Sequence, residues 1–165
     1  MKSQIPIDHY LEAIREFQKK VPNAHVGGSI GLYLHGVDLK RPLGQSDIDM
    51  TIEDYLPQNF GTEQIHKSSS SQSDFDYNFH FNIGTQLYIK MEIRVCPEPS
   101  FDKIYHGEIY YNVSKKRDIL FWKDKYARNG VNKHMNDLWV ITGDEKYKTP
   151  TTIHVPKPFD DDLPF

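Results

Sequence analysis

This chain of 165 residues has one cysteine, no long apolar run and little excess of either charge. Its single cysteine, Cys96, excludes an intrachain disulfide and fits a reducing compartment, so we expect a cytoplasmic protein. No apolar run is long enough to span a bilayer, and residues 1–4 do not open a signal peptide, so we expect no membrane partner. Because the formal net charge is only −3, no overall attraction draws the chain to nucleic acid.

Two aspartates stand out in residues 46–52, where polar and apolar residues alternate. Because successive side chains of a strand point to opposite faces, we expect Asp47 and Asp49 on one face and Ile48 and Met50 on the other. Two carboxylates about 5 Å apart repel by roughly 3 kcal/mol at an effective dielectric constant near 20. A fold keeps such a pair most readily around a cation, and carboxylate oxygens suit Mg²⁺ or Mn²⁺.

The turn Gly27-Gly28-Ser29 lies between a predicted strand at residues 25–26 and a predicted helix at residues 30–35. Glycine lets backbone N–H groups approach phosphate oxygens closely, and a helix start offers unpaired N–H donors. We expect Ser29 to cap the helix and to offer its hydroxyl to a phosphate. A plain strand-to-helix turn has the same residues, so the turn alone does not indicate nucleotide binding.

A hairpin is predicted from residues 77–83 and 86–95, which alternate in polarity and are separated by a glycine turn. In the second strand, aliphatic residues form one face, and Lys90, Glu92 and Arg94 lie on the other. The hairpin therefore places one acid between two basic residues on a polar face.

If the second hairpin strand lies beside residues 46–52, Glu92 completes a cluster of three carboxylates. A half-solvated strand has the same polar face without any site, and Asp74 and Asp76 are the alternative third acids. None of the eight histidines has a zinc-binding spacing, and we expect only His80 near the cluster.

Basic residues are candidates for binding phosphates. Lys90 and Arg94 flank the third acid, and Lys123 is our choice in a predicted helix. Lysines are also common on a solvated helix face that binds nothing. The Lys40-Arg41 pair lies in a predicted loop, where a charge is usually solvated, or contacts an acceptor.

The remaining pattern predicts one compact domain, residues 1–147, followed by an unpacked tail, residues 148–165, that is rich in Pro, Thr and Asp. The serine-rich residues 67–73 are expected to form a mobile loop. Further helices are predicted at residues 7–20, 114–128 and 133–140. We expect an α+β fold, with a mixed sheet flanked by helices on one side.

The elements Gly28-Ser29, Asp47-Ile48-Asp49 and Glu92 resemble the nucleotidyltransferase superfamily that includes DNA polymerase beta. Members of that superfamily have a Gly-Ser or Gly-Gly turn at a helix start, an Asp-x-Asp strand and a third acid on a neighbouring strand. The interval from the turn to the aspartates is a few residues longer here, with the excess in residues 37–45. The resemblance covers the first two thirds of the chain well and the rest loosely.

The resemblance implies an enzyme that transfers a nucleoside monophosphate from an NTP to an acceptor hydroxyl and releases pyrophosphate. It implies two ions, Mg²⁺ or Mn²⁺, bridged by Asp47 and Asp49, with Glu92 on the ion at the attacking side. The acceptor would be a nucleic acid, a protein or a small molecule. The residues implied to contact the nucleotide are Gly27, Gly28, Ser29, Lys90, Arg94 and Lys123.

The chain ends in a short acidic and apolar peptide, Asp160-Asp161-Asp162-Leu163-Pro164-Phe165. This peptide resembles the C-terminal peptide of bacterial single-stranded DNA-binding proteins, which docks replication and repair enzymes. In such a peptide the terminal phenylalanine fills an apolar pocket, and the aspartates speed the encounter with a positive surface. A solubilising acidic tail is the alternative. A phage or mobile-element origin would fit the docking role.

Two other functions are compatible with these features. The chain could be a non-enzymatic interaction protein that uses its acidic C-terminal peptide to engage replication or repair factors. It could also be a toxin–antitoxin or defence nucleotidyltransferase that modifies a protein or an RNA.

Overall fold

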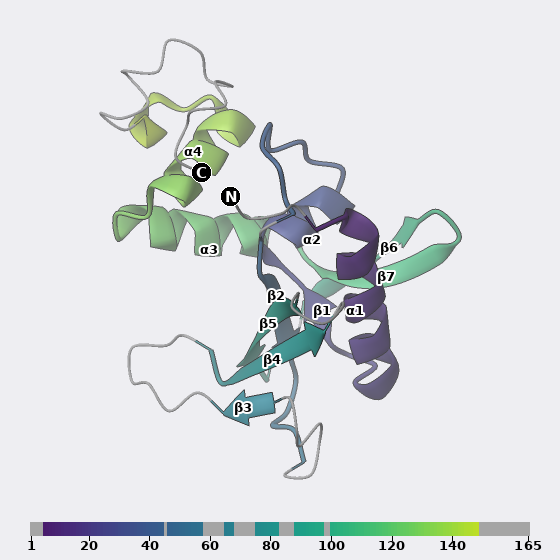
Figure 1. The fold of residues 1–165 in the computed structure, drawn as a ribbon. Helices are drawn as coiled ribbons and strands as arrows, with labels where there is room; N and C mark the ends of the chain where they lie inside the picture. Colours follow the sequence, from purple (N-terminus) through teal and green to yellow (C-terminus); the bar gives the residue numbers. More distant parts are fainter. Residues whose placement is uncertain are drawn as a thin grey trace.

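The computed structural model describes residues 5–44, 46–57, 65–67, 75–82, 88–97 and 100–148. Figure 1 shows strands with helices packed around them, in agreement with the predicted α+β class. Along the chain the elements are α1 (Ile7–Lys20), β1 (His25–Val26), α2 (Gly28–Leu34), β2 (Ile48–Ile52), β3 (Ile65–Lys67), β4 (Tyr77–Asn82), β5 (Tyr88–Val95), β6 (Phe101–His106), β7 (Ile109–Ser114), α3 (Lys116–Arg128), α4 (Asn132–Thr142) and the 3₁₀ helix η1 (Glu145–Tyr147).

Within the described residues, seven strands form one mixed sheet in the order β3-β4-β5-β2-β1-β7-β6. The pairs β2–β5 and β1–β7 are parallel, and the other adjacent pairs are antiparallel. The mixed sheet and the β4–β5 hairpin confirm the predictions. The strand order also places the strand that carries Asp49 directly beside the strand that carries Glu92.

One face of the sheet is apolar and forms the core. Ile48 and Met50 of β2 and Ile93 of β5 are at most 1% exposed. Helix α1 packs on this face, where the rings of Phe17 on α1 and Phe79 on β4 have centroids 6.3 Å apart. Full burial of a side chain of this size contributes roughly 1.5 to 3 kcal/mol. The core therefore fixes which face of β2 and β5 is left for polar residues.

Helices lie on both faces of the sheet, so the prediction of helices on one side was wrong. Arg94 of β5 points away from the core, and its Cζ atom lies 3.8 Å from the ring centroid of Trp122 on α3. The same guanidinium group donates to Tyr126 Oη at 3.0 Å. A cation–π contact therefore holds α3 over the polar face, which the apolar pattern of the sequence did not predict.

The hairpin β6–β7 has no counterpart in the sequence predictions. Tyr105 and Tyr110 on this hairpin are 71% and 50% exposed, so alternation of apolar and polar residues does not mark its strands. Ser114 was predicted to begin a helix, but it ends β7, because Val113 pairs with β1 and extends the strand. Helix α3 begins two residues later, at Lys116.

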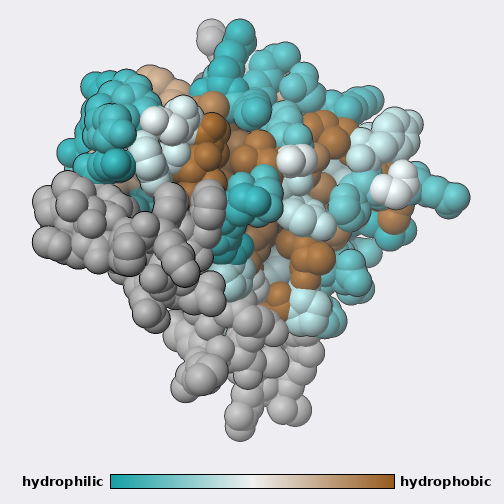
Figure 2. Space-filling view, turned by 90° about the horizontal axis from the view of Figure 1, so that it is seen from above, coloured by the Kyte–Doolittle hydropathy of each residue, from teal (hydrophilic) through white to brown (hydrophobic). Residues whose placement is uncertain are grey.

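Hydrophobic residues also reach the surface, as Figure 2 shows for the face seen from above. A groove of about 560 Å³ lies beside residues 36–44, and its apolar lining includes Ile5, Tyr33 and Leu43. Leu39 in the same loop is buried and anchors the loop against the body of the protein. This anchoring brings Arg41, two residues further along, next to α2.

Several predicted features lie outside the described residues. They are the acidic C-terminal peptide at residues 160–165, the alternative acid Asp74 and most of the serine-rich segment, residues 68–73. In the ranges that the structure describes, no helix is long and apolar enough to cross a membrane.

Candidate active site

Asp47, Asp49 and Glu92 lie together on the polar face of the sheet and line one cavity. Asp49 and Glu92 are direct partners in the parallel pairing of β2 and β5, so their side chains leave the sheet on the same side. Asp47 precedes β2, and its carboxyl group is hydrogen-bonded to that of Glu92. Asp76, the alternative third acid, is instead occupied by the Val95 N–H group, which donates to its carboxylate at 2.8 Å.

Burial and mutual repulsion raise the pKa values of two of these acids. Burial, followed by the charge of Asp47, raises the pKa of Asp49 to about 6. Burial, the charge of Asp49 and the hydrogen bond to Asp47 raise the pKa of Glu92 to about 7. Carboxyl groups whose pKa is raised by burial and by neighbouring acids occur preferentially at functional sites.

Gly28 lets the glycine turn approach the acids. Its φ of +60° lies in the left-handed region, and a Cβ atom at this position would collide with the Asp49 carboxylate. The Gly27 N–H group donates to the Asp49 carbonyl oxygen at 2.7 Å. The predicted turn therefore lies directly against the predicted acids, in a geometry that only glycine permits at position 28.

Ser29 does not cap α2, so that prediction was wrong. The helix begins at Gly28 with Gly27 as its N-cap, and no side chain caps it. The Ser29 hydroxyl is buried and accepts hydrogen bonds from Arg41 Nη2 at 2.7 Å and from Lys123 Nζ at 3.3 Å. The Ser29 hydroxyl therefore binds two basic side chains and not the backbone at the start of the helix.

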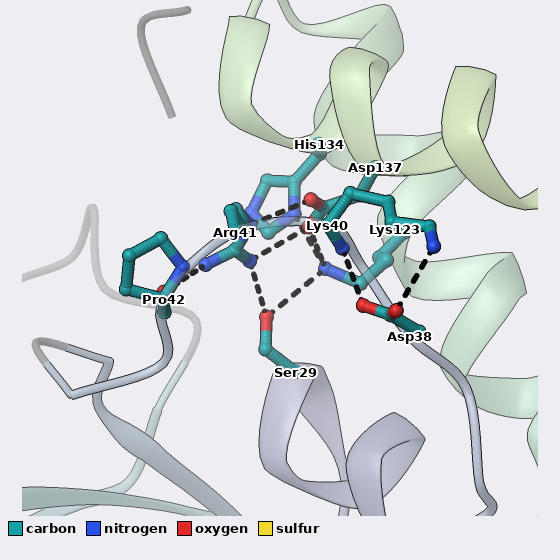
Figure 3. A network of polar contacts seen from close by, with 8 residues as sticks. All are labelled: Ser29, Asp38, Lys40, Arg41, Pro42, Lys123, His134 and Asp137. Carbon is teal, nitrogen blue, oxygen red and sulfur yellow. Dashed lines mark hydrogen bonds and ion pairs between the residues drawn. The ribbon is translucent and has the colours of Figure 1, made fainter. Parts of the chain in front are cut away.

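A buried network of charges surrounds the Ser29 hydroxyl (Figure 3). Asp137 of α4 has a fully buried side chain, which accepts from Arg41 Nε at 2.7 Å and from Lys123 Nζ at 2.7 Å. The side chains of Arg41 and Lys123 are only 4% and 3% exposed. Two basic side chains are therefore held by one buried carboxylate directly beside the glycine turn.

The groups of this network shift one another's pKa values. Burial alone would raise the pKa of Asp137, but hydrogen bonds from Arg41 and the charge of Lys123 outweigh burial and lower it. Burial lowers the pKa of Lys123, and the Asp137 carboxylate offsets part of that effect. Asp137 is therefore ionised at neutral pH, and it is the group that stabilises both cations.

His134 also belongs to the site, so the prediction that only His80 lies near the acids was wrong. Its Nδ1 lies 3.3 Å from Lys123 Nζ, and it lines the cavity over the acids, whereas the ring of His80 packs on that of Tyr88. Burial, followed by the charges of Lys123 and Lys133, lowers the pKa of His134 to about 3. The imidazole is therefore neutral at pH 7.

Two cavities meet at Asp49. The first, of about 420 Å³, lies over the three acids and includes Ser29 and Lys133 in its lining. The second, of about 330 Å³, lies between the polar face of the sheet and α3. Its polar and aromatic lining includes His25, Thr51, Arg94, Phe121, Trp122 and Lys123. The residues common to both cavities are Asp49, Phe75, Tyr126 and His134.

The basic residues chosen from the sequence have different surroundings. Lys123 lies in the buried network, and Arg94 lines the 330 Å³ cavity against Trp122. Lys90 Nζ lies 3.9 Å from Glu92 Oε2 and lines neither of the two cavities. Arg41 was expected to be solvated or to contact an acceptor, and Lys133 was not predicted, because no local pattern places Arg41 beside Ser29 or Lys133 in the same cavity.

The donor set of the acids fits a divalent cation. Of the described residues, no three His, Cys, Asp or Glu side chains stand ready as a metal site. The carboxyl groups of Asp47, Asp49 and Glu92 nevertheless line the same cavity. Carboxylate oxygens are the ligands that Mg²⁺ and Mn²⁺ prefer.

Comparison with known proteins gives one informative likeness. No model of a protein family matches this chain, and no curated protein sequence matches it. The crystal structure of an antigenic nucleotidyltransferase-like protein from Paracoccidioides brasiliensis superposes with a TM-score of 0.54. The match is 13% identical in sequence and covers 84% of this chain and 76% of the other. The chain therefore has a nucleotidyltransferase-like fold.

The raised pKa of Asp49 predicts that Asp49→Asn stabilises the metal-free protein at high pH. The folded chain holds the Asp49 proton more tightly than the unfolded chain does, so ionisation between the two pKa values favours unfolding. We expect the variant to match the wild type near pH 4 and to exceed its free energy of unfolding by roughly 1 to 3 kcal/mol near pH 8. Urea denaturation in EDTA measures the difference. A wild type that is more stable than the variant near pH 8 would contradict this account of the site.

Asp137→Asn should destabilise the protein by about 3 to 5 kcal/mol, because Arg41 and Lys123 would stay buried without their counter-charge. Asp38→Asn is the matched control. Its carboxylate pairs with Lys40 at 3.1 Å, but the Asp38 side chain is 71% exposed, so we expect an unchanged melting temperature. Thermal unfolding of both variants tests the network, and equal melting temperatures would rule out a stabilising role for Asp137.

Proposed function

We propose that this protein is a metal-dependent nucleotidyltransferase that moves a nucleoside monophosphate from an NTP to an acceptor hydroxyl and releases pyrophosphate. The observation that carries the proposal is the register of β2 and β5, which sets Asp49 opposite Glu92, with Gly28 packed against Asp49. The nucleotidyltransferase-like fold supports it.

The three acids are the proposed ion ligands. Asp47, Asp49 and Glu92 would hold Mg²⁺ or Mn²⁺ through carboxylate oxygens. Ions bound there lower the pKa of an attacking hydroxyl and offset the charge of the phosphates. The chain itself sets the spacing of the carboxylates through the strand register. Glu92, beside the ion on the attacking side, would also be placed to help accept the proton of the acceptor hydroxyl.

The network around Ser29 is the proposed triphosphate site. Arg41 and Lys123 both donate to the buried Ser29 hydroxyl beside the glycine turn, and both are held by Asp137. Lys133 adds a further cation to the lining of the 420 Å³ cavity. Because Asp137 holds both buried cations in place before a ligand arrives, little reorganisation is needed when phosphates bind.

The 330 Å³ cavity is the proposed nucleoside site. It begins at Gly28 and Asp49 and continues under α3, where Trp122 provides an aromatic wall and Thr51 a polar group. Clefts of this size, mostly apolar with a few polar groups, are typical of small-ligand sites. We assign Arg94 to the wall of this cavity rather than to the phosphates, because its guanidinium group is already stacked on Trp122.

The decisive experiment is calorimetric titration of the full chain with each of the four NTPs in the presence of Mn²⁺. We expect the wild type and the exposed control Asp38→Asn to bind at least one NTP, and Asp49→Asn to lose that binding. Because Asp49→Asn is expected to be stable, a loss of binding reports on the site and not on folding. A wild type that binds none of the four, or an Asp49→Asn variant that binds as well as the wild type, would refute the proposal.

A further inference from the structure

Asn78 is a polar residue that the proposed function does not yet use. It lies on β4, where it is the direct cross-strand partner of Glu92 on β5. Its neighbours Tyr77 and Phe79 are buried in the core, so Asn78 faces the opposite side of the sheet, the side that carries Glu92. Partner residues on antiparallel strands have Cβ atoms about 5 Å apart. Asn78, Glu92 and Asp49 therefore form one row across three adjacent strands.

The Asn78 side chain has an unmet hydrogen-bonding requirement. Its Oδ1 atom is buried and finds no hydrogen-bond donor in the described part of the chain. Leaving a buried acceptor without a donor costs about 1 to 3 kcal/mol, so each such atom needs an explanation, for example a bound water molecule or ion. Glu92, its cross-strand partner, makes no hydrogen bond to it either.

We propose that Asn78 is a positioning residue of the ion site, whose amide oxygen accepts a hydrogen bond from a water molecule on the divalent cation held by Glu92. The inference rests on the proposed function. Mg²⁺ and similar small ions keep several of their water molecules when carboxylates bind them, so donors of the kind that Asn78 lacks arrive with the ion. Groups that hold the ligands and waters of a metal contribute 10- to 100-fold to its affinity in general.

Asn112 provides a matched comparison within the same sheet. Its Oδ1 atom is also buried without a partner, but its Nδ2 donates to Pro22 O at 2.8 Å and to Ala24 O at 3.4 Å. Those bonds tie β7 to the segment before β1, which is a purely structural task. Replacement of Asn112 should therefore lower stability without changing ion affinity.

The test measures the Mn²⁺ affinity and the melting temperature of the full chain for Asn78→Leu, Asn78→Asp and Asn112→Leu, with Mn²⁺ alone as the probe. We expect Asn78→Leu to keep or raise the melting temperature while weakening Mn²⁺ binding by roughly 10- to 100-fold. Asn78→Asp keeps an oxygen at the same place, so it should bind Mn²⁺ at least as tightly as the wild type. Asn112→Leu should show the reverse, a lower melting temperature with wild-type affinity.

The result that overturns the inference is an Asn78→Leu variant whose Mn²⁺ affinity stays within twofold of the wild type while the wild type binds the ion. A melting temperature that falls as far as that of Asn112→Leu would equally assign Asn78 a structural role. If the wild type binds no Mn²⁺, the proposed function fails, and this inference fails with it. If the wild type binds Mn²⁺ and Asn78→Leu binds it equally well, only this inference fails.

Discussion

The parallel pairing of β2 with β5 is the constraint on which the rest of this site depends. It aligns Ile48 with Met91 and Met50 with Ile93 on the buried face, and the same alignment sets Asp49 against Glu92 on the other. A slip of one residue would turn the acid into the core and an aliphatic side chain out of it. The apolar packing that stabilises the fold therefore also fixes the spacing of the carboxylates.

Two groups of buried charge with opposite sign meet at the turn of residues 27–29. On one side are the carboxyl groups around Asp49, and on the other are the cations that Asp137 gathers around Ser29. The charges of Lys123, Lys133 and Arg94 stabilise the Asp49 carboxylate, but burial and the charge of Asp47 outweigh them and raise its pKa. A ligand that brings both metal ions and phosphates would satisfy both at once. Such unbalanced charge lowers stability in the empty protein and is a common feature of functional sites.

The parts of the site that depend on a few consecutive residues could be predicted from the sequence. The alternation in residues 46–52 and the glycines at 27 and 28 are visible locally, because strand period and turn chemistry act over a few residues. The partnership of Glu92 needed the strand order, which follows from tertiary packing. Arg41 contacts Asp137 across 96 positions of sequence, so a loop arginine that normally faces water became a buried cation only through the fold. The hairpin β6–β7 escaped prediction because its exposed aromatic residues obscure the period of its strands.

An NTP bound as proposed would span the two cavities that share the Asp49 wall, with its phosphates over the acids and its nucleoside under α3. Asp49 would then lie beside the link between the two halves of one molecule. A free nucleoside or free pyrophosphate would fill one cavity only. Each would therefore be held more weakly than the intact NTP, and each could leave the site separately.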